Sequence, residues 1–200
     1  HRIFNTKGRR LSEKIEGFGD IESLQSISDR EILVGGLHSE LRILDIKSTK
    51  FSEKIGGFDG HILTFQSISD WEIIVGGVSV TGRSKLQILN TETKQFSEKI
   101  EGFGNNSIFS FLPISDREIL VGGDRGELRI LDTKSRKLSE KIGGFGNHDI
   151  NSFQSISDQE VLVGGLGGEL RIFNTESRRL SEKIEGFDKS IYSSQPISDQ

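Results

Sequence analysis

Residues 60–77 read GHILTFQSISDWEIIVGG, and residues 94–103 close the same unit with KQFSEKIEGF. Apolar and β-branched runs alternate here with short polar turns, in which Ser and Asp side chains can bond the local backbone. The connections are too short to hold a helix. The pattern predicts a meander of four antiparallel strands, at residues 61–68, 72–75, 85–89 and 95–100.

The same unit recurs along the whole chain, as ISD, then VGG, then L-[RQ]-I, then SEKI. The ISD block begins at Ile27, Ile68, Ile114, Ile156 and Ile197, and the SEKI block at Ser12, Ser52, Ser97, Ser139 and Ser181. The period is therefore about 42 residues, which indicates one supersecondary unit that buries its apolar face against the next copy.

Apolar residues recur at fixed places in the unit and are predicted to form the core. They are Ile21, Ile62, Ile108, Ile150 and Ile191 in the first strand, Val34, Val75, Val121 and Val163 in the second, and Ile43, Ile88, Ile130 and Ile172 in the third. Paired glycines follow each second strand and are expected to let backbones approach or the strand bend. Phosphate binding by these glycines is the alternative, but no helix follows them whose N-terminal dipole could hold a phosphate. These pairs begin at Gly35, Gly76, Gly122 and Gly164.

The SEKI segment alternates charged and apolar residues, as the exposed edge strand of a sheet does. Its repeated Lys is expected to discourage pairing with a foreign chain, and a charged ligand site is the alternative. A Phe follows Gly shortly after each of the last four SEKI blocks, at Phe58, Phe103, Phe145 and Phe187. We expect these rings to pack between units, although they are also the candidates for stacking on a sugar.

Composition excludes several classes of function. The 200 residues carry a net charge of −4 with the two signs interspersed, so no basic block suits a nucleic-acid backbone. Cysteine is absent, which removes disulfides and thiolate metal sites and suits a reducing, cytoplasmic setting. The apolar runs are too short for a membrane-spanning helix, and no leader peptide is visible, so we expect no membrane insertion.

The unit resembles a WD40 repeat over essentially the whole chain. Gly60-His61 matches the Gly-His pair that precedes the first strand in that family, and Asn147-His148 approaches it. The ILVGG stretch stands where the family has small residues. The Trp-Asp pair after the third strand lacks its Trp in every copy, so the family's buried Asp–His–Ser–Trp network cannot be complete. Its place is taken by Phe4-Asn5, Leu44-Asp45, Leu89-Asn90, Leu131-Asp132 and Phe173-Asn174.

The resemblance implies an all-β fold, a β-propeller of four-stranded antiparallel blades, as a single domain or fragment over residues 1–200. Complete blades are expected at about 19–56, 60–101, 106–143 and 148–185. A partial fifth blade is split between 1–16, with strands at 2–5 and 10–15, and 188–200, with a strand at 190–197. These pieces either join in a gapped fifth blade that closes the ring, or belong to a section of a longer propeller, which we favour.

Loops on the rim of such a scaffold are where recognition is expected, and one rim is formed by the second-to-third and fourth-to-first connections. The most divergent loop among the copies is residues 78–84, VSVTGRS. A plain solvated rim is the alternative to a partner-binding one. The candidate rim residues are His38, Asp59, His61, Val80, Arg83, Asn105, Asn106, Arg125, His148, Asp149, Asp188 and Lys189.

The resemblance favours a noncatalytic scaffold for protein partners, as a subunit of a larger assembly. The alternative is a repeat lectin or small-molecule binder with sites between blades. A propeller hydrolase would need acidic side chains that converge at the channel mouth. No catalytic residue, cofactor or metal is expected, because no nucleophile is paired with an oriented base and His148 with Asp149 lacks a third metal ligand by spacing.

Overall fold

The computed structural model of the chain describes residues 4–5, 10–11 and 15–193. Four antiparallel four-stranded sheets follow one another, each with its strands in sequence order. The first strands are β3 (Ile21–Ser26), β7 (His61–Ser67), β11 (Ile108–Pro113) and β15 (Ile150–Ser155). The second strands are β4 (Glu31–Gly36), β8 (Glu72–Val78), β12 (Glu118–Gly123) and β16 (Glu160–Gly165). The described residues contain no α-helix.

The outer half of each sheet is formed by the third and fourth strands. The third strands are β5 (Leu41–Asp45), β9 (Ser84–Asn90), β13 (Leu128–Asp132) and β17 (Leu170–Asn174). The fourth strands are β6 (Lys50–Phe51), β10 (Gln95–Phe96), β14 (Lys137–Leu138) and β18 (Arg179–Leu180). Two three-residue 3-10 turns, η1 (Asp124–Gly126) and η2 (Leu166–Gly168), join the second and third strands of the last two sheets.

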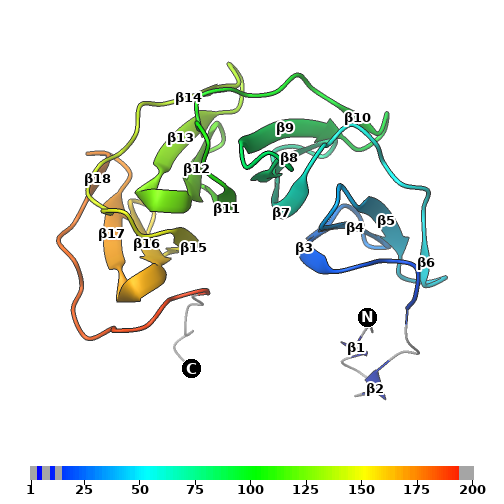
Figure 1. Cartoon of the computed structure of the whole chain (residues 1–200), viewed down its shortest axis with the longest axis horizontal. Helices are drawn as coiled ribbons and strands as arrows, with labels where there is room; N and C mark the ends of the chain where they lie inside the picture. Colours follow the sequence, from blue (N-terminus) through cyan, green and yellow to red (C-terminus); the bar gives the residue numbers. More distant parts are fainter. Residues whose placement is uncertain (1–3, 6–9, 12–14, 194–200) are drawn as a thin grey trace.

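The four sheets stand side by side on an arc. Figure 1 shows the first strands on the inside of the arc, the fourth strands on the outside, and the arc open between the first and the last of the four sheets. Neighbouring first strands contact one another, β3 with β7, β7 with β11 and β11 with β15. Each sheet therefore packs face to face against the next.

The fourth strand is shorter than the sequence predicted. The unit was expected to end in a strand over residues 95–100, but only Gln95 and Phe96 pair with β9. The reason is Ser97, whose hydroxyl accepts the Ile88 N–H at 3.0 Å and donates to Glu98 O at 2.8 Å. The side chain thus replaces a rung of the ladder, and the backbone rejoins the sheet when the Ile100 N–H donates to Leu86 O. The repeated Ser ends the strand in each sheet.

The paired glycines lie inside the second strands and not after them. A Cβ on Gly76 would lie 2.6 Å from the Phe111 ring and 2.8 Å from Ile108, both on the next sheet. A Cβ on Gly77 would lie 1.9 Å from the His61 carbonyl oxygen of the same sheet. The close approach of backbones predicted from the sequence is therefore confirmed, and a bulge in each first strand lies opposite the pair.

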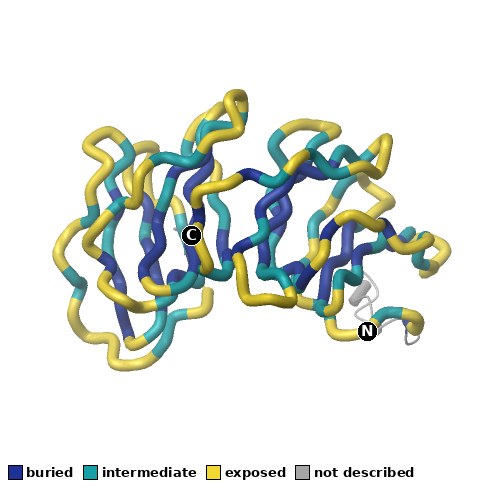
Figure 2. Tube along the Cα trace, turned by 45° about the horizontal axis from the view of Figure 1, so that its top comes forward, coloured by how far each residue is buried: buried dark blue, intermediate teal, exposed yellow. Residues whose placement is uncertain are grey.

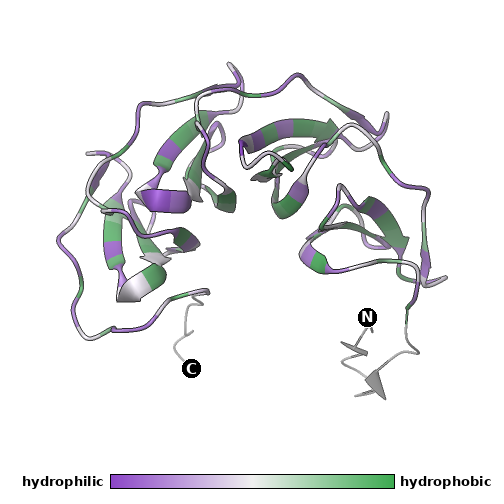
Figure 3. Cartoon of the chain, in the orientation of Figure 1, coloured by the Kyte–Doolittle hydropathy of each residue, from purple (hydrophilic) through white to green (hydrophobic). Residues whose placement is uncertain are grey.

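Apolar cores fill the three gaps between successive sheets. Figure 2 shows burial concentrated on the strands, and Figure 3 shows that the same strands are mostly apolar. The Val of every second strand is fully buried, as predicted. At the two ends of the array three predicted core positions are only half-buried, because no four-stranded sheet is described beside the outer face there. These positions are Ile21, Ile172 and Ile191.

The predicted pieces of the partial fifth unit are described only in part. At one end β1 (Phe4–Asn5) pairs antiparallel with β2 (Arg10–Leu11), as expected for a third and a fourth strand. At the other end residues 190–193 form no strand, which corrects the prediction of one at 190–197. Ile191 nevertheless donates its N–H to Gly165 O and packs on Gly164, as the first-strand Ile of each later sheet packs on the preceding glycine. The remaining residues of these predictions lie outside the described part.

Candidate functional site

The predicted rim is held together by backbone hydrogen bonds between neighbouring sheets. The Ser39 N–H donates to Gly60 O at 2.7 Å, and the Gly60 N–H donates to the Ser39 hydroxyl at 2.9 Å. Two sheets further on, the Gly126 N–H donates to His148 O at 2.8 Å. The turns of the first and third sheets are thus tied through their backbones to the segment that enters the next sheet, and at the second sheet the Ser84 hydroxyl donates to Gly104 O at 2.7 Å. The two kinds of connection do share one rim.

Two of the candidate histidines meet on this rim. The rings of His38 and His61 lie with their centroids 5.4 Å apart, edge to face. The His38 N–H donates to His61 Nδ1 at 3.2 Å, so this nitrogen acts as an acceptor. A neutral ring that accepts at Nδ1 carries its proton on Nε2. Lys54 completes the contact by donating to His38 O at 3.3 Å.

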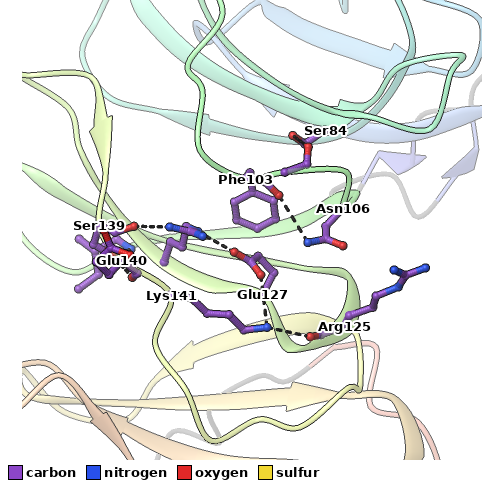
Figure 4. A network of polar contacts seen from close by, with 11 residues as sticks. Ser84, Phe103, Asn106, Arg125, Glu127, Ser139, Glu140 and Lys141 are labelled. Atoms are coloured by element: carbon purple, nitrogen blue, oxygen red, sulfur yellow. Dashed lines mark hydrogen bonds and ion pairs between the residues drawn. The ribbon is translucent and has the colours of Figure 1, made fainter.

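Arg125, Asp149 and His148 also meet, at the junction of the third and fourth sheets. The Arg125 N–H donates to the Asp149 carboxylate at 3.0 Å, and Lys141 donates to Arg125 O at 3.1 Å. Figure 4 shows Lys141 between Arg125 and Glu127. The backbone of Arg125 is therefore fixed from two sides, while its side chain is exposed.

The polar network beneath this turn joins two of the repeated sequence blocks, L-[RQ]-I and SEKI. Glu127 is only 6% exposed, and its carboxylate lies 2.6 Å from Arg129 Nε and 3.3 Å from Lys141 Nζ. Arg129 also donates to Ser139 O at 2.6 Å. The Lys of the SEKI block was expected to protect an exposed edge, but here it pairs inward with a buried carboxylate. The first sheet repeats this arrangement with Glu40, Arg42 and Lys54.

The other candidate rim residues occupy separate places along the same rim. Val80 is 66% exposed and lies with Arg83 in the turn after β8, which the Ser79 N–H closes by donating to Arg83 O at 2.7 Å. Asp59, Asn105 and Asn106, exposed or half-buried, lie in the segments that enter the second and third sheets, and the exposed Asp188 and Lys189 follow the last sheet. The rim is therefore a row of neighbouring contacts and not one convergent cluster. Among the described residues no group of three His, Cys, Asp or Glu could hold a metal ion.

A pocket on the opposite rim was not predicted. It has a volume of about 530 Å³ and lies between the first two sheets, where the turns after their first and third strands meet. Trp71, which is 53% exposed, contributes to its wall together with Glu31, Asp45, Lys50 and Lys94. The signal was present in the sequence, because the only Trp of the chain stands where the other units carry Arg30, Arg117 and Gln159.

The Asp45 carboxylate in this pocket is held in its ionised form. The backbone N–H of Ser48, which donates to it at 2.7 Å, and the Arg30 guanidinium at 2.5 Å together lower the pKa of Asp45 to about 2. The same turn in the third sheet has Ser135 and Arg117 beside Asp132, whose pKa is also lowered to about 2. These carboxylates remain charged throughout the neutral and mildly acidic range.

Comparison with known proteins gives a structural likeness only. No known protein-family model matches the sequence, and no curated protein matches it. A crystal structure of the computationally designed Ika8 protein is similar over 98% of this chain, with a TM-score of 0.76 at 14% sequence identity. The chain spans 59% of that protein. In all, 1061 solved chains resemble it, and an arrangement this widespread shows the fold without selecting a function.

One structural feature bears on the membrane prediction. In the described residues, no helix has the length and apolar character that crossing a bilayer requires.

Proposed function

We propose that the four sheets are blades of a WD40-like β-propeller, and that the protein is a noncatalytic scaffold that binds other proteins through one rim. The arc of sheets with first strands innermost, and the resemblance of each unit to a WD40 repeat, support the propeller. A larger assembly in which this chain is one subunit follows from the same proposal. A cytoplasmic location remains part of it, on the basis of the cysteine-free composition.

The observation that carries the scaffold proposal is the row of hydrogen bonds between neighbouring sheets along the rim. Ser39 and Gly126 are held through their backbones by the next sheet, while exposed side chains such as Arg125 extend from the fixed turns. A rigid backbone lowers the entropic cost of ordering loops when a partner binds. Exposed, varied side chains on such a backbone supply the recognition.

The lectin alternative loses most of its candidate residues. Phe58, Phe103 and Phe145 are 1–2% exposed, so these rings cannot stack on a sugar without unfolding their surroundings. They pack between sheets, as the sequence favoured. Phe187 is the exception at 50% exposed, because the described part of the chain has no following sheet whose fourth strand could cover the ring. One exposed ring does not make the repeated, multivalent site that the lectin hypothesis requires.

Site-specific photo-crosslinking tests the scaffold proposal. A photoreactive residue is placed at Arg125 on the proposed binding rim, and in a second variant at Lys134, which is exposed on the opposite rim of the same sheet. In extracts of the source cells we expect a discrete, stoichiometric protein adduct from position 125 and not from position 134. Equal adducts from both positions, or none from either, would refute the proposed rim. Multivalent binding on a glycan array would favour the lectin instead.

A further inference from the structure

Two of the three gaps between sheets are bridged by the same ion pair. Arg136 Nη2 lies 2.9 Å from Glu72 Oε1 across the second gap, and Arg178 Nη2 lies 2.7 Å from Glu118 Oε1 across the third. Each arginine sits in the turn between the third and fourth strands with a φ of 56–57°, and each glutamate is the first residue of the preceding sheet's second strand. The chain thus places a guanidinium at one fixed point between its own sheets.

The first gap has the acceptor without the arginine. Glu31 begins β4 as Glu72 begins β8, and Lys94 occupies the turn position of Arg136 with a φ of 56°. No ion pair joins Lys94 to Glu31 in the described structure. Glu31 is exposed, whereas Glu72 and Glu118 are half-buried under their arginines. The pocket of about 530 Å³ lies at this place and is lined by both Glu31 and Lys94.

The walls of this pocket suit a cation. Trp71 presents an indole that is 53% exposed, and indole is the best aromatic partner for a guanidinium or ammonium group. Acidic side chains outnumber basic ones in the lining, with Glu31, Asp45, Asp70 and Glu92 against Lys50 and Lys94. Asp45 is already paired with Arg30, so Glu31 and not Asp45 is the carboxylate open to a further cation.

We propose that the pocket between the first two sheets binds an arginine side chain of a partner protein. The Glu31 carboxylate forms an ion pair with the partner's guanidinium, as Glu72 does with Arg136, and the Trp71 indole stacks on the flat face of the guanidinium. A guanidinium is planar and offers paired N–H donors to a carboxylate, which a lysine ammonium does not. This proposal goes beyond the binding rim of the proposed scaffold, because the pocket lies on the rim opposite Arg125. It names one chemical feature of a partner that docks there, an exposed arginine.

Trp71 is the only tryptophan in the chain, so its fluorescence reports on this pocket directly. The purified chain is titrated at constant ionic strength with the peptide acetyl-Gly-Arg-Gly-amide. Identical peptides with lysine or citrulline in place of arginine are the controls. We expect a saturable change in emission with a Kd on the order of 1 mM for the arginine peptide, and at least about tenfold weaker binding of the other two.

Three variants separate the pocket from a general effect of charge. Glu31→Gln should weaken binding of the arginine peptide at least about tenfold, which is the loss expected when a charge-assisted pair becomes neutral. Glu118→Gln makes the same change in the bridged third gap and should leave the affinity unchanged. Lys94→Arg should restore the internal bridge to Glu31 and block the peptide. Circular dichroism checks that each variant is folded.

Equal affinity for the three peptides, no emission change up to about 10 mM, or full binding by Glu31→Gln would each overturn the arginine site. Such a failure, with a rim-specific adduct from position 125, would leave the scaffold proposal intact. Peptide binding without any adduct from that position would instead support the arginine site and refute the proposed rim.

Discussion

Replacement of Gly122 by alanine tests whether successive sheets pack as closely as the structure shows. A Cβ at this position would lie 2.6 Å from Ile150 Cγ2, 2.7 Å from the Phe153 ring and 2.7 Å from the Ser110 hydroxyl. Real Cβ atoms do not approach heavy atoms this closely, so the fourth sheet must shift or its side chains must leave their rotamers. Such overpacking of a dense core costs about 1–3 kcal/mol of unfolding free energy.

The matched control is Gly143→Ala, at an exposed glycine whose added Cβ would meet nothing within 4 Å. This variant should match the parent or gain about 0.4–1 kcal/mol through a less flexible unfolded chain. Urea unfolding followed by circular dichroism measures both, and heating should lower the melting temperature of the Gly122 variant by about 2–4 °C per kcal/mol lost. If Gly122→Ala unfolds at the same urea midpoint as Gly143→Ala, the close packing between sheets is wrong.

Three further predictions concern single side chains. Phe103→Ala should cost about 3–5 kcal/mol because the ring is 1% exposed, and Phe187→Ala less than half of that; comparable losses in urea unfolding would contradict the difference in burial. Ser139→Ala leaves a backbone N–H without its acceptor and should cost about 1 kcal/mol, whereas Ser139→Thr keeps the hydroxyl. Because the folded pKa values of Asp45 and Asp132 are about 2 against a usual 3.8, their stabilisation is present above pH 3.8 and lost as pH falls towards 2. The double Asp→Asn variant should show a shallower loss of stability over that range, and an unchanged slope would contradict the pKa shift.

Much of the fold could be predicted from the sequence because the unit is repeated. A position that stays apolar in every copy, such as Val34, is under the same packing constraint each time, and it is buried in all four sheets. The end of the fourth strand could not be predicted from its apolar and charged alternation. It depends on Ser97, whose hydroxyl takes the place of a backbone group in the ladder. The signal was the invariant Ser of the SEKI block.

The candidate site was predicted less completely. Topology alone places the turns of His38 and Arg125 on one rim, because second-to-third connections always share an end of a meander. Which side chains face each other across a gap depends on how closely the sheets approach, and a repeat pattern does not contain that distance. The pocket beside Trp71 arises where two positions, Trp71 and Lys94, differ from the residues that the other units carry there. The meaning of Lys94 becomes clear only once Arg136 and Arg178, at the same position, are seen to bridge the later gaps.

Amide hydrogen exchange followed by NMR is the most direct test of a rigid rim formed between sheets. The Ser39 and Gly126 amides lie in turns, and their acceptors belong to the next sheet, at Gly60 and His148. The exposed Asn147, whose amide finds no acceptor in the described part of the chain, is the internal reference. We predict that Ser39 and Gly126 exchange as slowly as amides inside the strands. Exchange of both as fast as Asn147 would contradict the rigid rim and, with it, the platform for partners.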